Sequence, residues 1–306
     1  MELKKIAILG AGAVGCYVLW GLAQKPGIEV CLVAEGARRE RLRTEGLTIN
    51  GQVYRPAVCT PDEAHGVDLL IVTVKYNALA AALEDIRRVV GEHTTVISLM
   101  NGVNTEDIIG EVIGDEKIVH SLIKVASERK GSSVRFDPEA TVGVIYGEKD
   151  PARGDERVRA LNALFDGSGV RHRATDVILA EIWSKFRLNI SNNQPQAMVG
   201  CGVGAYTDSE HMAFLRKALA EEVNRVAAAK GVDIAAAASA KGSKVQPAAR
   251  YSTLQDLDAH RHTEVDLFAG AMVKMGRELG IPVPYNEFAY HMIKALEEKN
   301  DGRFDY

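Results

Sequence analysis

The sequence predicts an α/β protein: a Rossmann-like, doubly wound and mostly parallel sheet in the N-terminal part, followed by an all-α C-terminal domain. Two observations support this prediction. Up to about residue 176, short apolar runs alternate with amphipathic segments, which is typical of parallel strands connected by helices. After that point only helical periodicity remains. We therefore expect one domain over residues 1–176 and a second over residues 177–306.

The bulk composition agrees with two globular domains. The chain has 306 residues, of which 46% are hydrophobic and 25% charged. A net charge of -4 gives no sign of nucleic-acid binding, and the sequence has no apolar run long enough to cross a membrane. The spacing of the four cysteines in the sequence is not that of a metal site. We expect their thiols to be reduced, as in a cytoplasmic protein. They are Cys16, Cys31, Cys59 and Cys201.

The first element is a strand that leads into a glycine-rich turn. Ile6 to Leu9 form a short apolar run, and Gly10, Gly12 and Gly15 then follow the G-x-G-x-x-G spacing before a helix over 13–24. This order predicts a dinucleotide site, because the turn brings the backbone and a helix N-terminus close to a pyrophosphate. The residues expected to contact the cofactor there are Gly10, Ala11, Gly12, Ala13, Val14 and Gly15.

The second strand, within residues 27–35, ends in an acidic residue that bears on cofactor choice. The Glu35 carboxylate can accept hydrogen bonds from the ribose hydroxyls of NAD, and its charge would repel the 2'-phosphate of NADP. Arg38 and Arg39 follow at once. They either clamp a phosphate or belong to the solvated first turn of a helix.

The alternation of strands and helices continues through the first domain. We expect strands over 67–75, 94–102, 117–129 and 141–148, and helices over 76–90, 105–113 and 156–169. Asn104 or Thr105 is the expected cap of the helix over 105–113. Lys75 and Asn101 lie at the carboxyl ends of two strands, where ligands of doubly wound sheets bind.

The second half of the chain predicts four main helices. They cover residues 177–200, 210–231, 262–280 and 284–299. The first is expected to end near Pro195, and Asp208 or Ser209 to cap the second. Thr263 and Asp266 resemble a capping box for the third, and Gly280 is its expected stop.

The helix over 177–200 carries an unusual polar row. Lys185, Asn189 and Asn193 follow each other at intervals of four, which places them on one helical face. Asn is a poor helix former, so two of them within a helix suggest that their amides have a role. A solvated helix surface is the simpler alternative.

With these motifs in place, the chain resembles the ketopantoate reductase (2-dehydropantoate 2-reductase) family over nearly its whole length. The helix with the lysine and two asparagines and the segment from Ser252 to Glu264 are the most specific parts. The full set is "ILGAGAVG" at 8–15, "VTVK" at 72–75, "LMNGVN" at 99–104, "IWSKFRLNISNN" at 182–193, "YSTLQDLDAHRHTEVD" at 251–266 and "GIPVPYN" at 280–286.

The resemblance implies that NADPH reduces the ketone of ketopantoate to pantoate, a step towards pantothenate and coenzyme A. The site residues that it implies are Lys185 and Glu264 in catalysis, Asn101, Asn189, Asn193 and Ser252 at the substrate, and Glu35, Lys75 and Asn101 at the cofactor. One position departs from the family, which commonly has an arginine where this chain has Glu35. This departure leaves NAD possible as the cofactor, and it keeps an NAD-dependent D-2-hydroxyacid dehydrogenase as the alternative activity.

The chemistry of these residues agrees with ketone reduction. Hydride transfer to a ketone leaves negative charge on oxygen, which an ammonium group such as that of Lys185 stabilises and protonates. Glu264 would orient that amine or bind a substrate hydroxyl, although it could also be a helix N-terminal charge. No residue set suggests a metal site, and we expect a homodimer. A catalytically silent dinucleotide sensor is the alternative of another class, and it would have no need of a proton donor.

Overall fold

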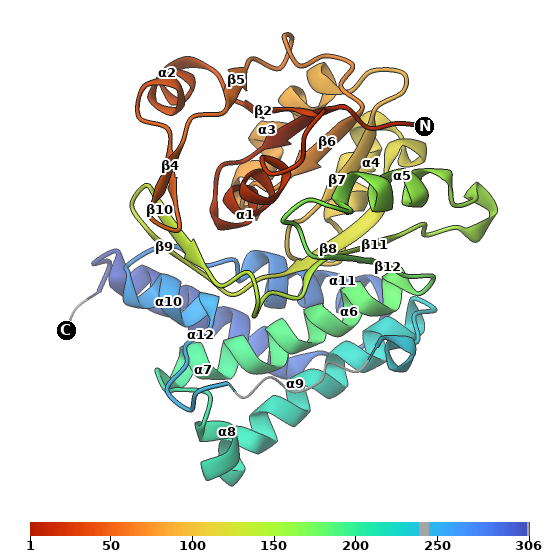
Figure 1. The fold of residues 1–306 in the computed structure, drawn as a ribbon. Helices are drawn as coiled ribbons and strands as arrows, with labels where there is room; N and C mark the ends of the chain where they lie inside the picture. Colours follow the sequence, from red (N-terminus) through yellow and green to blue (C-terminus); the bar gives the residue numbers. More distant parts are fainter. Residues whose placement is uncertain (239–244, 305) are drawn as a thin grey trace. The chain divides into compact units, whose positions relative to one another are not determined.

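The computed structural model describes residues 1–238, 245–304 and 306 (Figure 1). The chain divides into two compact units, Met1–Ile178 (unit 1) and Leu179–Tyr306 (unit 2). Unit 1 combines strands and helices, whereas the described residues of unit 2 form helices and loops without a strand. The expected fold class, a Rossmann-like sheet followed by an all-α part, is confirmed.

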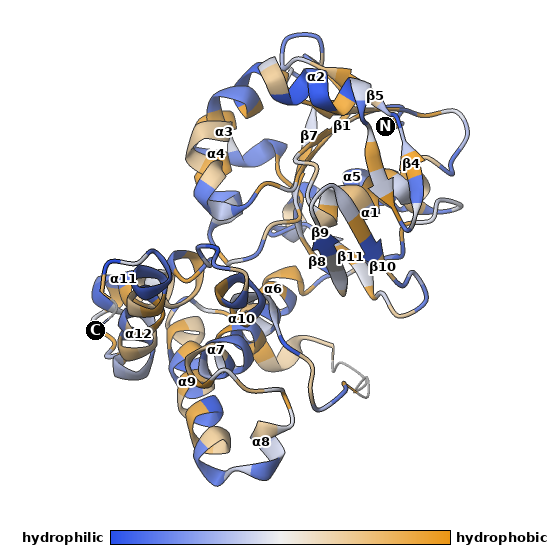
Figure 2. Ribbon diagram, turned by 90° about the vertical axis from the view of Figure 1, so that its left-hand side faces the viewer, coloured by the Kyte–Doolittle hydropathy of each residue, from blue (hydrophilic) through white to orange (hydrophobic). Residues whose placement is uncertain are grey.

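The centre of unit 1 is a five-stranded parallel sheet. Its order is β5 (Ala57–Cys59), β2 (Glu29–Val33), β1 (Lys5–Leu9), β6 (Leu69–Val72) and β7 (Thr95–Ser98). The inner strands are apolar and buried on both faces, as parallel strands covered by helices must be. Figure 2 shows β1 and β7 in the colours of hydrophobic residues, and α2 as mainly hydrophilic.

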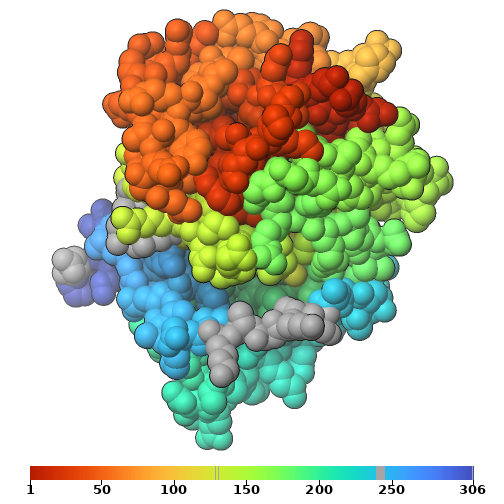
Figure 3. Space-filling view, in the orientation of Figure 1, coloured from red at the N-terminus to blue at the C-terminus, as the bar shows by residue number. Residues whose placement is uncertain are grey.

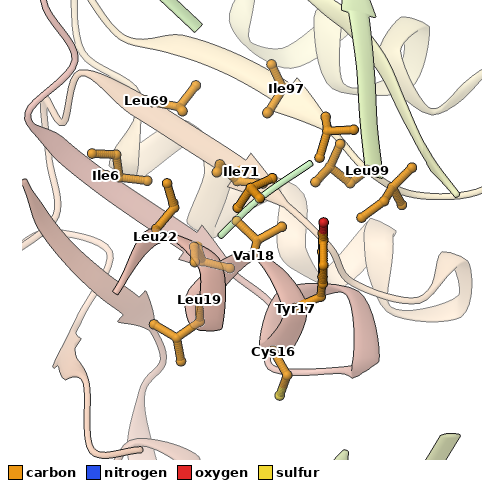
Figure 4. Packing of buried hydrophobic residues seen from close by; sticks show 14 of the residues in the cluster. Ile6, Cys16, Tyr17, Val18, Leu19, Leu22, Leu69, Ile71, Ile97 and Leu99 are labelled. Atoms are coloured by element: carbon orange, nitrogen blue, oxygen red, sulfur yellow. The ribbon is translucent and has the colours of Figure 1, made fainter. Parts of the chain in front are cut away.

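Successive residues of a strand point to opposite faces of the sheet. Helices cover both faces of this sheet, which gives unit 1 two apolar cores. Ile6 and Ile8 of β1 pack with residues of α1, including Val18 and Leu22, as Figure 4 shows for Ile6, Val18 and Leu22. Ala7 and Leu9 belong to the opposite core, which also contains residues of α3 and α4. The helices of unit 1 are α1 (Ala13–Leu22), α2 (Gly36–Thr44), α3 (Tyr76–Val89), α4 (Thr105–Ile113) and α5 (Glu156–Phe165), with the short turns η1 (Asp115–Lys117) and η2 (Pro151–Arg153).

Two smaller sheets complete unit 1. One has the order β4 (Gln52–Tyr54), β3 (Leu47–Ile49), β10 (Ser133–Phe136) and β9 (Ser127–Lys130), and the other the order β12 (His172–Ala174), β11 (Gly143–Gly147) and β8 (His120–Lys124). Both contain antiparallel pairs, so the expected strands over 117–129 and 141–148 lie outside the parallel sheet. The three-residue strands were not expected, because so short a segment shows no periodicity.

The N-terminus is held within unit 1 by contacts with later segments. The amino group of Met1 lies 2.9 Å from Glu156 Oε1 at the start of α5. Figure 3 shows the corresponding red and green surfaces adjoining each other on this face of unit 1. None of the described helices of the chain is long and apolar enough to cross a membrane.

Unit 2 consists of helices, and three of them, α8, η4 and α10, were not expected from the sequence. The helix expected over 262–280 begins only at Asp266. The elements are α6 (Ile178–Leu188), η3 (Asn189–Asn193), α7 (Gln194–Val199), α8 (Ala205–Asp208), α9 (Glu210–Ala229), η4 (Ile234–Ala236), α10 (Ser252–Asp258), η5 (Asp266–Gly270), α11 (Ala271–Leu279) and α12 (Pro284–Asn300). Both η3 and η5 are single π-helical segments of five residues.

The expectation that the first helix of unit 2 ends near Pro195 is wrong. Helical structure continues through η3 and α7 to Val199, and Gly200 then ends it with φ 74°. Pro195 therefore lies inside a continuous helical stretch, where its missing N–H interrupts the hydrogen-bond ladder. The π segment directly before it widens the turn, as is common where a regular hydrogen-bond ladder is interrupted.

The expected caps have mixed outcomes. Ser209 caps α9, since its hydroxyl accepts a hydrogen bond from the Met212 N–H at 3.3 Å. Asn104 precedes α4 but makes no capping hydrogen bond, and the Thr263–Asp266 capping box is not formed. Thr263 Oγ1 instead accepts from the Val265 N–H at 3.1 Å. Gly280 ends α11 as expected, with φ 66°.

Candidate functional site

The glycine turn after β1 is formed by close backbone packing. Gly10 has φ 116°, and a Cβ there would lie 2.7 Å from the Thr73 carbonyl carbon. A Cβ on Gly15 would lie only 2.0 Å from the Gly10 carbonyl oxygen. Thr73 Oγ1 donates to that same oxygen at 2.7 Å. The strand, the turn and the start of α1 therefore approach each other as closely as glycine allows.

Gly12 has a different environment, and this difference suits a bound dinucleotide. A Cβ at Gly12 would meet no atom within 4 Å, so open space lies beside this position. No side chain caps α1, and its first turn has no acidic residue. The free N–H groups of Ala13, Val14 and their neighbours thus provide an uncompensated positive helix end beside a backbone that a pyrophosphate can approach. The residues present fit the pyrophosphate of a nicotinamide dinucleotide.

Glu35 lies between the end of β2 and the start of α2, and its carboxylate is held by an arginine from α3. Its carboxylate forms a two-pronged ion pair with Arg88, with Nη2–Oε1 and Nη1–Oε2 distances of 3.0 and 3.3 Å. Arg88 also binds Asp62 at 2.6 Å. Asp85 lies 3.6 Å from the same guanidinium, so three carboxylates share one positive charge. No local sequence pattern indicates this pair, because the two residues are 53 positions apart.

The two arginines that follow Glu35 have different surroundings. Arg39 pairs with Glu63, with distances of 3.0 and 2.8 Å from Nη2 to the two carboxylate oxygens. Partial burial, and then the positive charges of Arg41 and Arg129, lower the pKa of Arg38. Within the described residues, no ion pair is formed by Arg38. Its guanidinium is therefore the more available of the two for an added phosphate.

Lys75 and Asn101 follow β6 and β7, at the carboxyl edge of the parallel sheet. Lys75 is exposed at the start of α3, and Asn101 is half-buried in the loop before α4. Beneath this loop, Ser98 Oγ and Thr105 Oγ1 lie 3.2 Å apart, and Thr105 Oγ1 donates to Glu106 Oε2 at 2.8 Å. This network supports the segment that carries Asn101.

Glu106 is a buried carboxyl in that network. It is 5% exposed, and burial raises its pKa to about 7, although hydrogen bonds from Thr105 and from backbone N–H groups act in the opposite direction. His120 is also buried, and burial, followed by the positive charge of Lys149, lowers its pKa to about 4. His120 is therefore neutral at pH 7, whereas Glu106 changes its charge near that pH.

In unit 2, the lysine and the two asparagines lie on one helical stretch with a change of pitch. Lys185 is on α6, whereas Asn189 and Asn193 are the first and last residues of η3. The π segment changes the angular relation between the three side chains from that of a regular α-helix. Lys185 and Asn189 are half-buried and Asn193 is 6% exposed.

Asn193 meets one of the other predicted substrate ligands. Its Nδ2 donates to Ser252 Oγ at 3.4 Å, so the structure brings together two residues that are 59 positions apart. Gln196 holds the segment before α10 in place. Its Oε1 accepts from the Tyr251 N–H at 2.6 Å, and its Nε2 donates to the Ala249 carbonyl at 3.0 Å. Sequence reasoning missed Gln196, although a polar residue in an apolar helical stretch was a signal.

Glu264 lies between two anchored residues. The backbone N–H and the hydroxyl of Thr263 both donate to Glu297 Oε1, at 2.7 and 2.6 Å. Glu297 is 3% exposed and its other oxygen pairs with Lys294 at 3.1 Å. Val265 is fully buried. A carboxylate from α12 thus fixes the main chain that carries the half-buried Glu264, a role for which the sequence offered no pattern.

The histidines near this segment do not form a metal site. His262 lies 3.4 Å from Glu297 and 3.2 Å from Asp301. In the parts of the chain that the structure describes, no group of three or more His, Cys, Asp or Glu side chains is arranged to hold a metal ion. The same described residues contain four free cysteines and no disulfide between them.

The parallel sheet, the glycine turn and the amine- and amide-bearing helices define a nicotinamide-dependent oxidoreductase of the Rossmann class. Family models extend this conclusion. Residues 6–145 match the family described as "Ketopantoate reductase PanE/ApbA", and residues 177–297 match its C-terminal part. The chain belongs to the ketopantoate reductase family, and its enzymatic class is that of NAD(P)-dependent oxidoreductases acting on a ketone.

Individual relatives cover almost the whole chain. A 2-dehydropantoate 2-reductase from Archaeoglobus fulgidus is 30% identical over 304 residues, which cover 97% of this chain and 99% of the relative. The crystal structure of a ketopantoate reductase from Ralstonia eutropha JMP134 has a TM-score of 0.81 at 26% identity, covering 97% and 100% of the two chains. A D-mandelate dehydrogenase bound to NADH has a TM-score of 0.83 at 25% identity, covering 97% and 99%.

Proposed function

We propose that this protein is a 2-dehydropantoate 2-reductase, which reduces the ketone of ketopantoate to pantoate in pantothenate and coenzyme A biosynthesis in the cytoplasm. The hydrogen bond between Asn193 and Ser252 is the main structural support, because it joins two of the proposed substrate-binding groups. The similarity to curated 2-dehydropantoate 2-reductases over nearly the whole chain supports the same activity. In this proposal residues 1–176 bind the dinucleotide, and residues 177–306 bind the substrate and carry the catalytic groups.

The proposed site uses an amine, a carboxylate and neutral hydrogen-bonding groups. The reduced nicotinamide supplies a hydride to the ketone carbon when it is bound. Lys185 stabilises the negative charge that develops on the ketone oxygen and donates a proton to it. Glu264 orients this amine or accepts a hydrogen bond from a substrate hydroxyl. The polar oxygens of the substrate are bound by Asn101, Asn189, Asn193 and Ser252.

In this proposal the residues of the glycine turn in unit 1 bind and orient the dinucleotide. Backbone N–H groups at the start of α1 would hold the pyrophosphate, and Lys75 and Asn101 would lie near the reactive end of the cofactor. The contacts proposed at the turn come from Gly10, Ala11, Gly12, Ala13, Val14 and Gly15. Glu35 lies at the position that usually contacts the ribose.

Rates with combinations of cofactor and substrate test the activity. We expect the highest kcat/KM with NADPH and ketopantoate. It should be at least tenfold above the value for any other aryl or alkyl 2-keto acid, with either NADPH or NADH. A smaller preference for ketopantoate, or a higher rate with an aryl keto acid, would contradict the proposal. It would favour a D-2-hydroxyacid dehydrogenase, for which the similarity to D-mandelate dehydrogenase is the specific support.

The role of Lys185 has its own test. We expect Lys185→Ala to lower kcat by about 100-fold or more while the cofactor Kd stays nearly unchanged. Lys274→Ala, which changes an exposed lysine of α11, is the control and should retain the parent rate. An unchanged kcat in Lys185→Ala would remove this residue from the mechanism, and an absence of turnover in the parent protein would favour a dinucleotide sensor.

Cofactor choice depends on the residues after β2. The family resemblance favours NADP, and the guanidinium of Arg38, which forms no ion pair with any described residue, supports it. The Glu35 carboxylate is engaged by Arg88, which it shares with Asp62 and Asp85. We expect Arg38→Gln to weaken NADPH about tenfold with no change for NADH, because a charged hydrogen bond to phosphate is lost. Arg39→Gln is the matched control, since Arg39 is already paired with Glu63. Equal effects on both cofactors would contradict this assignment and would favour NAD.

A homodimer is supported by an exposed aromatic surface on unit 2. Phe214 of α9 and Tyr285 of α12 lie in an edge-to-face contact 5.9 Å apart, and Phe288 is 59% exposed one turn further on. Exposed aromatic clusters of this kind are typical of interfaces between subunits. We expect a dimer in sedimentation experiments and a monomer for Phe288→Asp. Val53→Asp in unit 1 is the control, and a monomeric parent protein would contradict the proposal.

A further inference from the structure

A groove in unit 2 is lined by none of the residues proposed for ketone reduction. It has a volume of about 270 Å³ and is lined by residues of α6, η3, α8 and α9. The lining residues are Arg187, Leu188, Ser191, Tyr206, Ala213, Arg216, Lys217 and Ala220. Figure 1 shows α6, α8 and α9 within unit 2. The volume is sufficient for a small organic molecule but not for a dinucleotide.

The charges around the groove are all positive. Arg187, Arg216 and Lys217 line it, and its lining contains no carboxylate. Lys217 lies 3.7 Å from Glu221, one turn further along α9, whereas neither arginine forms an ion pair among the described residues. The two arginines beside the groove have no such carboxylate to balance their charge, so their placement favours an anionic ligand.

Both arginines are held in place by neutral partners. Arg187 Nη1 donates to Asn224 Oδ1 at 3.2 Å. The Arg216 guanidinium lies over the ring of Tyr206, 5.5 Å from its centroid. Neither partner uses up the positive charge, and both restrict the side chain. Guanidinium groups that are oriented in this way lose less entropy when they bind a phosphate.

The groove also contains a buried hydroxyl. Ser191 is 3% exposed and is one of the residues that line the groove. Leu188 and the two alanines add apolar surface beside it. A hydroxyl donor, two oriented guanidinium groups and a short apolar wall together match a phosphate that is attached to a small organic group.

We propose that this groove binds a small organic phosphate. The ligand's phosphate would lie between Arg187 and Arg216, with the Ser191 hydroxyl donating to it and Lys217 at the rim. Ser191 lies on η3 between Asn189 and Asn193. A ligand there would therefore contact the helical segment that presents both amides, but from a different face from that of Lys185.

Phenyl phosphate is a suitable probe, since it combines a phosphate with a small apolar group. Titration calorimetry on the full chain, with saturating NADPH to fill the glycine turn, should show saturable binding at constant ionic strength. We expect Arg187→Gln and Arg216→Gln each to weaken binding about tenfold, and Ser191→Ala to weaken it severalfold. Arg277→Gln and Lys274→Gln, two exposed cations on α11, are the matched controls and should bind as the parent does.

Four results would overturn the proposal. The first two are an absence of saturable binding in the parent and an equal affinity of the parent and Arg216→Gln. Another is weakening by Ser252→Ala without weakening by Arg216→Gln, which would place the probe in the proposed keto acid site. The fourth is a change of oligomeric state in Arg216→Gln, which would make the groove a contact between subunits. None of these readouts depends on turnover, so the ketone reductase proposal stands or fails separately.

Discussion

The two units form their parts of the proposed site in different ways. In unit 1 the main chain forms the site, because Gly10, Gly15 and Thr73 pack so closely that backbone N–H groups are left facing open space at Gly12. In unit 2 side chains form it, and a buried carboxylate, Glu297, holds the segment on which one of them lies. A dinucleotide has a pyrophosphate that backbone groups can bind, whereas a small keto acid needs groups placed individually.

This difference determines which substitutions each unit tolerates. A backbone site fails when a side chain is added, and a side-chain site fails when a supporting group is removed. The following predictions test this contrast, starting with the largest expected effect.

Gly15→Ala should have the largest effect of all. The new methyl group would lie 2.0 Å from the Gly10 carbonyl oxygen, so β1 and α1 would have to separate. We expect loss of the folded state, or a fall in Tm of about 10 °C or more, measured by thermal unfolding. Gly12→Ala has no such contact and should retain the parent Tm while binding cofactor more weakly. Equal stability of the two variants would contradict the packing argument.

Glu222→Ala removes a buried carboxylate of unit 2. Glu222 is 1% exposed and accepts hydrogen bonds from the backbone N–H groups of Tyr285 and Asn286 at the start of α12, at 3.0 and 2.9 Å. Its loss leaves these donors unsatisfied, and we expect the free energy of unfolding to fall by about 2–4 kcal/mol in urea denaturation. The control is Glu221→Ala, whose exposed carboxylate pairs only with Lys217 and should contribute less than about 1 kcal/mol.

Glu106→Gln tests the buried carboxyl of unit 1, which lacks a cationic partner. Because its folded pKa of about 7 lies above the ordinary value of 4.5, the folded state binds this proton more tightly. Its contribution to stability is therefore complete below pH 4.5 and is lost as the pH rises to 7. We expect the variant to gain about 2–3 kcal/mol relative to the parent between pH 5 and 7.5.

The pH dependence of His120 has the opposite sign and serves as the comparison. Its pKa is lowered from 6.5 to about 4, so stability is lost as the pH falls through that range. His120→Gln should therefore reduce the loss of stability on acidification without affecting the loss above pH 6.5. Urea denaturation at several pH values would measure both slopes. An unchanged slope for Glu106→Gln would show that this carboxyl is ionised in the folded state.

Glu297→Ala removes a buried carboxylate, as Glu222→Ala does, and should lower stability for the same reason. Its effect on catalysis should be smaller. Loss of the two Thr263 hydrogen bonds frees the segment that carries Glu264, so we expect kcat to fall about tenfold with the cofactor Kd unchanged. Glu297→Gln keeps an accepting oxygen and should recover most of that rate. Glu298→Ala, which changes an exposed neighbour paired with Arg303, is the control. Equal falls in kcat for Glu297→Ala and Glu298→Ala would assign no positioning role to Glu297.

Much of the fold could be predicted because it depends on local patterns. The run Ile6–Leu9, the glycine spacing and the helix after it form one continuous segment, and each step follows from the preceding residues. Ser209 and Gly280 were likewise recognisable as helix ends from their immediate surroundings. The short strands β3, β4 and β12 were not, because three residues contain too little periodicity and depend on their partner strands.

The sequence by itself determined the longer helices, the inner strands of the parallel sheet, the glycine turn and the spacing from Lys185 to Asn193, since the residues involved are close neighbours in the chain. Only the tertiary structure decided that Arg88 pairs with Glu35, that Asn193 meets Ser252 and that Glu297 holds Thr263. The physical reason is that a charged or polar side chain accepts any suitable partner, and the packing of distant helices and strands selects which partner comes within hydrogen-bonding distance.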